Sequence, residues 1–164
     1  MHMNTLRARA PTALHALPAR EAPQCEEVIG NLPSDRDFRV MRDAYRGSGG
    51  IARGDDLARL LEDHRCGDFI SLARLIANGE IFGFEWHDTY WVPMFQFDLR
   101  DLSNKPGSPR VVAELSTVFD GWALAVWFAQ RNSWLNDQRP VDLLDTELDN
   151  VLQAASADRF IANG

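Results

Sequence analysis

The chain has 164 residues, 45% of them hydrophobic, and a formal net charge of −7 at pH 7. This length can bury one good core or two small ones, and breaks at Pro and Gly favour two compact modules with a tail. No run of about 18 apolar residues is present, so we expect no membrane span. The negative charge argues against a protein that coats nucleic acid indiscriminately.

Two cysteines, Cys25 and Cys66, lie far apart in unlike contexts. This spacing favours free thiols in a reducing compartment over a disulfide framework. The N-terminus has arginines but lacks the apolar core of a secretion signal. We therefore expect a cytoplasmic protein.

Residues 1–33 contain four prolines among Ala, Arg and Glu and show no sustained period, which predicts a loose N-terminal arm. Ser34, with Asp37 three residues later, is typical of a helix start. The helix expected over residues 35–46 has three large apolar side chains on one face: Phe38, Met41 and Tyr45.

Arg39, Arg42 and Arg46 lie side by side on the neighbouring face of this helix. One interpretation is a basic edge that contacts DNA phosphates or an acidic partner. The simpler one is an amphipathic helix packed on the core with solvated arginines. Gly47-Ser48-Gly49-Gly50 then predicts a flexible hinge, which closes a segment over residues 34–50.

Two short helices and a hairpin are expected over residues 51–98. The first helix, residues 57–64, is capped by Asp55-Asp56, and the second spans about residues 70–78. A tight turn between them predicts a helix-turn-helix unit. Two aromatic-rich strands then flank the dipeptide His87-Asp88, which predicts a β-hairpin.

This order resembles the winged, excisionase-like or MerR-like DNA-binding module. The resemblance implies that the second helix enters the major groove and that the hairpin rests on the phosphate backbone. The residues expected at DNA are Ser71, Arg74, Ala77 and Asn78 on the second helix, with Arg59 and Arg65 for phosphates.

The charges of the module weaken this expectation. The second helix offers one arginine and no lysine, and the hairpin carries Glu85 and Asp88. Because phosphate neutralisation supplies much of the affinity for DNA, the module would bind only weakly unless it dimerises or is helped by Arg39, Arg42 and Arg46. The alternative is a degenerate winged module used for packing or dimerisation.

A linker over residues 99–109, marked by Pro106-Gly107, leads to a helical domain over residues 110–164. Asp120-Gly121 divides its first part into helices over residues 109–119 and 121–130. The second of these is apolar nearly all round, so it is either buried or meets a partner.

Asn136 and Asp137 follow in a turn where both can adopt positive φ, and Pro140 can begin a short helix. Thr146 and Asp149 approximate a capping box for the last helix.

The end of the chain resembles the toxin-binding domain of Xre/MbcA/ParS-type antitoxins over roughly residues 110–160. The matching runs are Asn132-Ser133-Trp134-Leu135, Pro140-Val141-Asp142-Leu143-Leu144-Asp145 and Ala157-Asp158-Arg159-Phe160. Ser133 stands where the family usually has proline, and Asn136 and Asp137 stand where glycines are usual. Asn and Asp accept left-handed backbone best among the other residues, so the loop shape can survive.

The resemblance implies an antitoxin of a type II toxin-antitoxin system that binds a RES-domain toxin, which attacks NAD. The C-terminal end would block the toxin's active site, and the protein would also bind its operator DNA and form a homodimer. The matching contact positions are Trp134, Leu135, Asp158, Arg159 and Phe160. The Arg159 guanidinium would form charge-assisted hydrogen bonds with acidic or phosphate-binding groups of the toxin's pocket. Phe160 would bury apolar area at the rim of that pocket.

No set of residues for catalysis is assembled in the sequence. No His accompanies a nucleophile in a recognisable motif, and Gly47–Gly50 lacks the Lys of a phosphate loop. His64-Arg65-Cys66 lacks a second pair of zinc ligands. We therefore expect neither an enzyme nor a cofactor or metal site.

The sequence thus predicts a mainly α fold with a small β-hairpin, in which an all-helical toxin-binding domain follows a winged helix-turn-helix-like module. Two alternatives remain for its function. One is a stand-alone DNA-binding regulator or mobile-element protein whose helical domain dimerises, and the other is an adaptor that has lost both partners.

Overall fold

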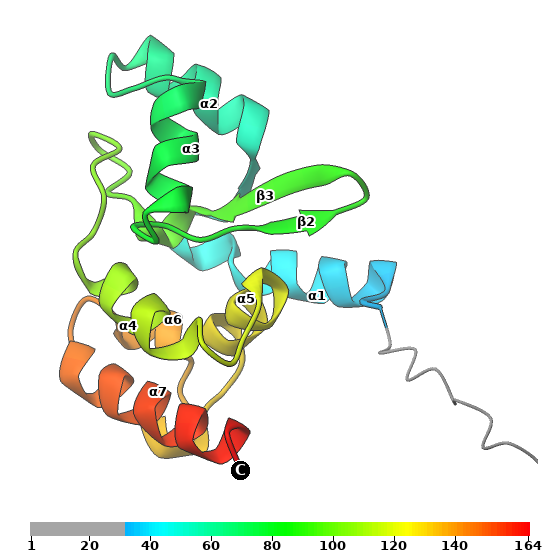
Figure 1. Ribbon diagram of the computed structural model, residues 1–164, viewed down its shortest axis with the longest axis vertical. Coiled ribbons are helices and arrows are strands. Elements are labelled where there is room, and N and C mark those ends of the chain that lie inside the picture. The colour runs from blue at the N-terminus through cyan, green and yellow to red at the C-terminus, as the bar shows by residue number, and fades with distance from the viewer. Residues whose placement is uncertain (1–31) are drawn as a thin grey trace, which may run out of the picture. The chain divides into compact units, whose positions relative to one another are not determined.

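Seven α-helices and a three-stranded antiparallel sheet make up the computed structural model, which describes residues 32–164 (Figure 1). The predicted class, mainly α with a small β element, is confirmed. The arm expected over residues 1–33 falls almost entirely outside the described residues. From Pro33 to Gly164 the chain forms one compact unit. No helix in this described part is long and apolar enough to cross a bilayer.

Helix α1, Asp35–Ala44, begins with the predicted capping box. The Ser34 hydroxyl accepts a hydrogen bond from the Asp37 N–H, and the Asp37 carboxylate accepts one from the Ser34 N–H. Phe38 and Met41 are buried as expected. The fully buried Tyr45 donates its hydroxyl hydrogen bond to the carbonyl of Ala125, so it fastens this helix to the C-terminal half of the chain.

The glycines after α1 form a defined turn where we expected an open hinge. A 3-10 turn, η1, covers Arg46–Ser48, and Gly49 and Gly50 have φ of 98° and 76°. The Gly50 N–H donates to the Tyr45 carbonyl at 2.8 Å, and the Gly50 carbonyl accepts from the Met94 N–H at 2.9 Å. The segment is therefore held at both ends by backbone hydrogen bonds.

Residues 51–98, for which we keep the name winged module from the resemblance, contain β1 (Ile51–Arg53), α2 (Gly54–Asp63), α3 (Phe69–Ala77), β2 (Phe84–Trp86) and β3 (Thr89–Pro93). The sheet order is β1-β3-β2, so the sequence prediction missed one edge strand. At three residues, β1 is too short to show an alternating pattern. The hairpin is confirmed: Trp86 pairs with Thr89, and the turn residues His87 and Asp88 have φ of 46° and 55°.

The two faces of this sheet are covered by different helices because successive strand residues point to opposite sides. Trp91 of β3 packs against Phe38 of α1, with ring centroids 5.1 Å apart. The next residue, Val92, belongs to the apolar cluster formed with α2 and α3. Helix α1 and the α2–α3 pair therefore lie on opposite faces of the sheet.

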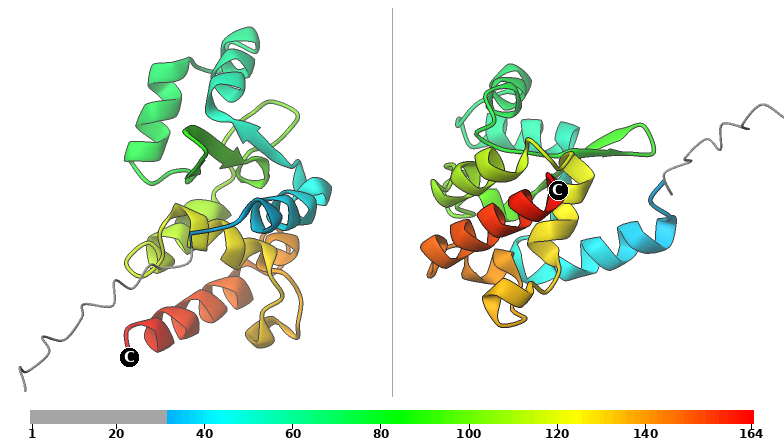
Figure 2. Two further views of the ribbon diagram at one scale, coloured as in Figure 1. Left: turned by 90° about the vertical axis from the view of Figure 1, so that its right-hand side faces the viewer. Right: turned by 60° about the horizontal axis from the view of Figure 1, so that its bottom comes forward.

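The C-terminal part contains α4 (Gly107–Leu115), α5 (Gly121–Ala129), α6 (Pro140–Leu143) and α7 (Leu148–Ala162), with α7 packed along α4 (Figure 2). The predicted N-cap Asp120 accepts a hydrogen bond from the Ala123 N–H at 2.8 Å. Helix α5 is largely buried by α1, α6 and β2 of the same chain. Of the two interpretations of this apolar helix, burial is therefore the one observed.

The turn after α5 follows the prediction closely. Asn136 and Asp137 have φ of 54° and 59°, and Pro140 stands in the first turn of α6. The predicted Thr146–Asp149 capping box is wrong, because the N-cap of α7 is Glu147, which makes no side-chain cap bond. The cap at Asp55-Asp56 is also displaced, since α2 begins at Gly54 and Arg53 is its N-cap.

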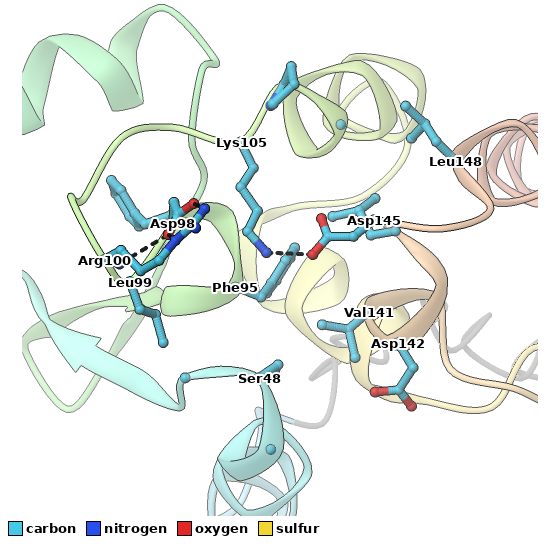
Figure 3. A pocket seen from close by; sticks show the side chains of 16 residues that line it. Ser48, Phe95, Asp98, Leu99, Arg100, Lys105, Val141, Asp142, Asp145 and Leu148 are labelled. Carbon is cyan, nitrogen blue, oxygen red and sulfur yellow. Dashed lines mark hydrogen bonds and ion pairs between the residues drawn. The ribbon is translucent and has the colours of Figure 1, made fainter.

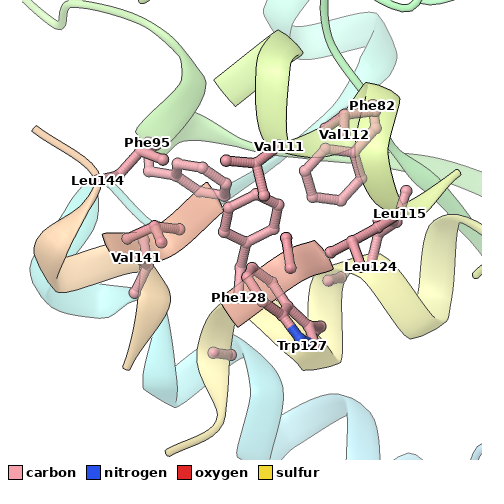
Figure 4. Packing of buried hydrophobic residues seen from close by; sticks show 14 of the residues in the cluster. Phe82, Phe95, Val111, Val112, Leu115, Leu124, Trp127, Phe128, Val141 and Leu144 are labelled. Carbon is pink, nitrogen blue, oxygen red and sulfur yellow. The ribbon is translucent and has the colours of Figure 1, made fainter. Parts of the chain in front are cut away.

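Two apolar clusters stabilise this unit. The smaller one joins α2, α3 and β3 and includes Leu57, Leu72 and Val92. The larger one joins the C-terminal helices to α1 and to aromatic residues of the winged module; Phe82 and Phe95 both contact Phe128 of α5 (Figure 4). The winged module and the helical domain thus share a core.

Candidate functional site

The last turns of α7 are anchored by a carboxylate that accepts hydrogen bonds from three side chains. Asp158 Oδ2 accepts from Nε1 of Trp127 at 2.8 Å and from Nδ2 of Asn132 at 2.7 Å. Its Oδ1 accepts from Nε1 of Trp134 at 3.1 Å. We expected Asp158 at the toxin surface, but the structure engages it within the chain.

Asn132 connects this carboxylate to the turn after α5. Its Oδ1 accepts from the Trp134 N–H at 2.8 Å while its Nδ2 donates to Asp158. Its backbone carbonyl accepts from the N–H groups of Leu135 and Asp137, each at 3.0 Å. One asparagine therefore closes the turn and fixes it to α7, which gives a physical reason for an asparagine at this position.

Arg159 is also engaged within the chain. Its guanidinium lies 3.1 Å from Oε1 of Glu114 on α4, and both side chains are partly exposed. The guanidinium that we expected to be available for the toxin is thus paired with a carboxylate of the neighbouring helix. Leu135 is buried at 3% exposure, so it supports the turn and does not offer a contact surface.

The exposed apolar side chains at this end are those of Phe160, Ile161 and Trp134, with exposed fractions of 80%, 63% and 58%. Phe160 and Ile161 lie in the last turn of α7, two and three residues after Asp158. Of the predicted contact residues, Phe160 and Trp134 therefore present apolar surface to solvent.

A groove of about 420 Å³ runs between the Trp134 turn and α7. Its α7 wall is formed by residues three or four positions apart: Asn150, Gln153, Ala154 and Ala157. The same helical spacing leads from Ala157 to Phe160 and Ile161. We call this groove together with Trp134, Phe160 and Ile161 the α7 surface.

The residues predicted to contact DNA are not brought onto one surface. Arg39 and Arg42 lie exposed on α1, and Arg46 pairs with Asp43 at 2.8 Å. Because α1 and α3 cover opposite faces of the sheet, these arginines do not extend the surface of α3.

On the α2–α3 side, Arg74, Ala77 and Asn78 are exposed, as are Arg59 and Arg65. Arg59 lies 3.6 Å from Asp56. Ser71 is half-buried and bonds to Asp68, the N-cap of α3. Hydrogen bonds from Ser71 hold the pKa of that Asp68 carboxyl below its usual value. Ser71 thus serves the helix cap.

A hollow of about 820 Å³ lies between the winged module and α6 (Figure 3). Lys105 Nζ lies 2.6 Å from Oδ2 of Asp145, and Asp98 bonds to the guanidinium of Arg100. Asp142 bonds to Arg139 at 2.7 Å. The charged side chains lining this hollow are therefore paired with one another or with a neighbour, and the Lys105–Asp145 pair joins the linker to the segment after α6. In residues 32–164, no three His, Cys, Asp or Glu side chains are grouped to hold a metal ion.

Trp127, Asn132 and Glu114 anchor α7, and the sequence did not predict this role for them. One signal was present, since a buried indole N–H requires an acceptor and Trp127 lies in an apolar row without one. The acceptor, Asp158, is 31 residues away, and only the fold identifies it.

No protein-family model, no curated protein and no solved structure matches the chain.

Proposed function

We propose that this protein is a non-enzymatic, cytoplasmic antitoxin of the Xre/MbcA/ParS type, which binds a RES-domain toxin and blocks its NAD-degrading active site. The proposal rests on the motif resemblance and on the shape of the turn that carries it. Asn136 and Asp137 adopt the left-handed backbone that the family's usual glycines would favour. The departures at Asn136 and Asp137 are therefore compatible with the backbone of such a turn.

One observation carries the proposal. The end of α7 presents Phe160 and Ile161 to solvent, while Asp158 in the same turn is fixed by three hydrogen bonds. An apolar end that is already ordered loses little conformational entropy on binding, so more of its burial energy contributes to affinity. Aromatic residues in such positions are typical anchors of interfaces.

The mechanism is occlusion by a helical end. Phe160 and Ile161 would enter the mouth of the toxin's cavity, and Trp134 would cover its rim. Asp158 and Arg159 take a different role from the one that the resemblance implies. They hold the end of α7 in place through Trp127 and Glu114, without contacting the toxin.

Co-expression with a RES-domain toxin tests this function. We expect the full chain to restore growth and the double variant Phe160→Ala/Ile161→Ala to lose rescue. Deleting residues 160–164 should also abolish rescue while it leaves the Asp158 anchor intact. Val40→Ala is a matched control, because Val40 is 62% exposed on α1 and lies outside the α7 surface. Full rescue by the deletion variant would disprove occlusion.

The second candidate is a DNA-binding regulator. The order β1-α2-α3-β2-β3, with a three-stranded sheet, favours it because a strand, two helices and a hairpin are the parts of a winged module. A gel shift at low ionic strength with the upstream region of the gene tests it. A specific complex that Arg74→Ala weakens would support DNA reading, and no complex would exclude it. The homodimer remains an expectation from the resemblance.

A further inference from the structure

We propose that the groove between α3 and the β2–β3 turn binds a polypeptide segment whose apolar side chains are flanked by Lys or Arg. The groove has a volume of about 490 Å³ and is separate from the α7 surface. Its walls come from α3, the start of α2 and the hairpin turn. The apolar lining residues are Phe69, Leu72, Ala73, Ile76, Ala77 and Tyr90.

The exposed part of this lining is unusually apolar for a helix that would read DNA. Phe69, which lines the groove, is 60% exposed, and Ile70, the next residue of α3, is 66% exposed. Arg74 is the only cationic residue of α3. Apart from the thymine methyl group, base edges and phosphates are polar, so they offer these apolar side chains few matching partners. An exposed apolar patch with a polar rim is instead typical of a protein-binding site.

The charge around the groove indicates the sign of the partner. Asp55 and Asp88 line it together with one cation, Arg53. The winged module, residues 51–98, has four arginines, no lysine and nine acidic residues, a net charge of −5. This field repels phosphate and attracts Lys and Arg side chains. A second copy of the chain, which carries a net charge of −7, is disfavoured for the same reason.

Two fluorescein-labelled peptides of equal length test the proposal with the full chain. Both have Leu at the same positions, and the polar positions are Lys in one and Glu in the other. We expect fluorescence anisotropy to show binding of the Lys peptide at least about tenfold tighter than of the Glu peptide. Higher ionic strength should weaken the Lys peptide, because exposed charges are screened.

Variants locate the binding. Ala73→Trp fills the groove from an exposed position and should weaken the Lys peptide about tenfold or more. Asp88→Asn removes one rim charge, and Asn tolerates the φ of 55° there, so binding should weaken about twofold to fivefold. Ala113→Trp, at an exposed position of α4, is the control and should change nothing.

Four outcomes of the peptide and self-association measurements would overturn the proposal. They are equal binding of both peptides, binding of neither, binding of the Lys peptide that Ala73→Trp leaves unchanged, and a concentration-dependent dimer that Ala73→Trp dissolves. The last outcome would assign the groove to a second copy. A gel shift of duplex DNA that is lost in Ala73→Trp would assign the groove to nucleic acid and would also overturn the proposal. None of these results depends on whether the chain neutralises a toxin.

Discussion

Asp158 Oδ2 lies 2.8 Å from the indole nitrogen of Trp127, which joins the last turns of α7 to α5. Asn132 and Trp134 donate to the same carboxylate, so three segments of the helical domain meet at one side chain. The side chain that joins these segments is therefore one that the antitoxin resemblance places at the toxin.

Asp158→Asn tests this anchor. An amide oxygen cannot serve all three donors, and the amide NH2 would face an N–H group. We expect the free energy of unfolding to fall by about 2 kcal/mol, measured by urea denaturation. Asp149→Asn, at an exposed position in the first turn of the same helix, should cost less than about 0.5 kcal/mol. Equal losses in the two variants would show that the Asp158 hydrogen bonds contribute nothing specific.

Gly121→Ala tests the junction between α5 and the strand segment before β2. A Cβ at Gly121 would lie 2.1 Å from the carbonyl oxygen of Gly83, which belongs to the backbone and cannot turn aside as a side chain could. We expect a loss of about 3 kcal/mol, because the elements must move apart. Gly47→Ala is the matched control, since a Cβ there meets nothing within 4 Å. A Gly121→Ala variant as stable as Gly47→Ala would contradict the close approach.

Gln96→Leu tests a buried amide that serves three backbone groups. The fully buried Gln96 accepts from the Phe82 N–H at 2.8 Å and donates to the carbonyls of Phe82 and Pro93. Leucine fills a similar volume but leaves these groups without partners, so we expect a loss of about 3 kcal/mol in thermal or urea unfolding. The exposed Gln130 provides the control variant Gln130→Leu, which should be close to neutral. A neutral Gln96→Leu would mean that water replaces the amide.

Acid unfolding tests the cap of α3. The Ser71 hydrogen bonds lower the pKa of Asp68 in the folded chain, so this carboxylate stabilises the fold fully above the ordinary Asp pKa of about 4. The contribution is lost as the pH falls through the lowered value. In Asp68→Asn, which keeps a capping oxygen, we expect stability at pH 7 to change little and the decline below about pH 4 to become shallower. An unchanged acid slope, equal to that of the exposed Asp63→Asn, would exclude this role.

The sequence alone determined the local features of this fold. The Ser34–Asp37 capping box, the Asp120 cap, the His87-Asp88 hairpin turn and the left-handed Asn136-Asp137 pair all form as predicted. Each depends on the backbone preferences of residues a few positions apart, which a sequence pattern records directly. The apolar periodicity likewise identified α4, α5 and the two helices of the winged module.

Only the tertiary structure decided which residues meet. It paired Asp158 with Trp127, buried Leu135, placed the α1 arginines on the opposite face of the sheet from α3, and brought Gly121 against Gly83. Some of these contacts join residues about 30 or more positions apart, and others depend on which face of the sheet a strand residue points to. The periodicity of one element does not encode which other elements will pack against it. For the same reason, the sequence identified Phe160 as a candidate contact, but the fold showed that its neighbours Asp158 and Arg159 hold it in place.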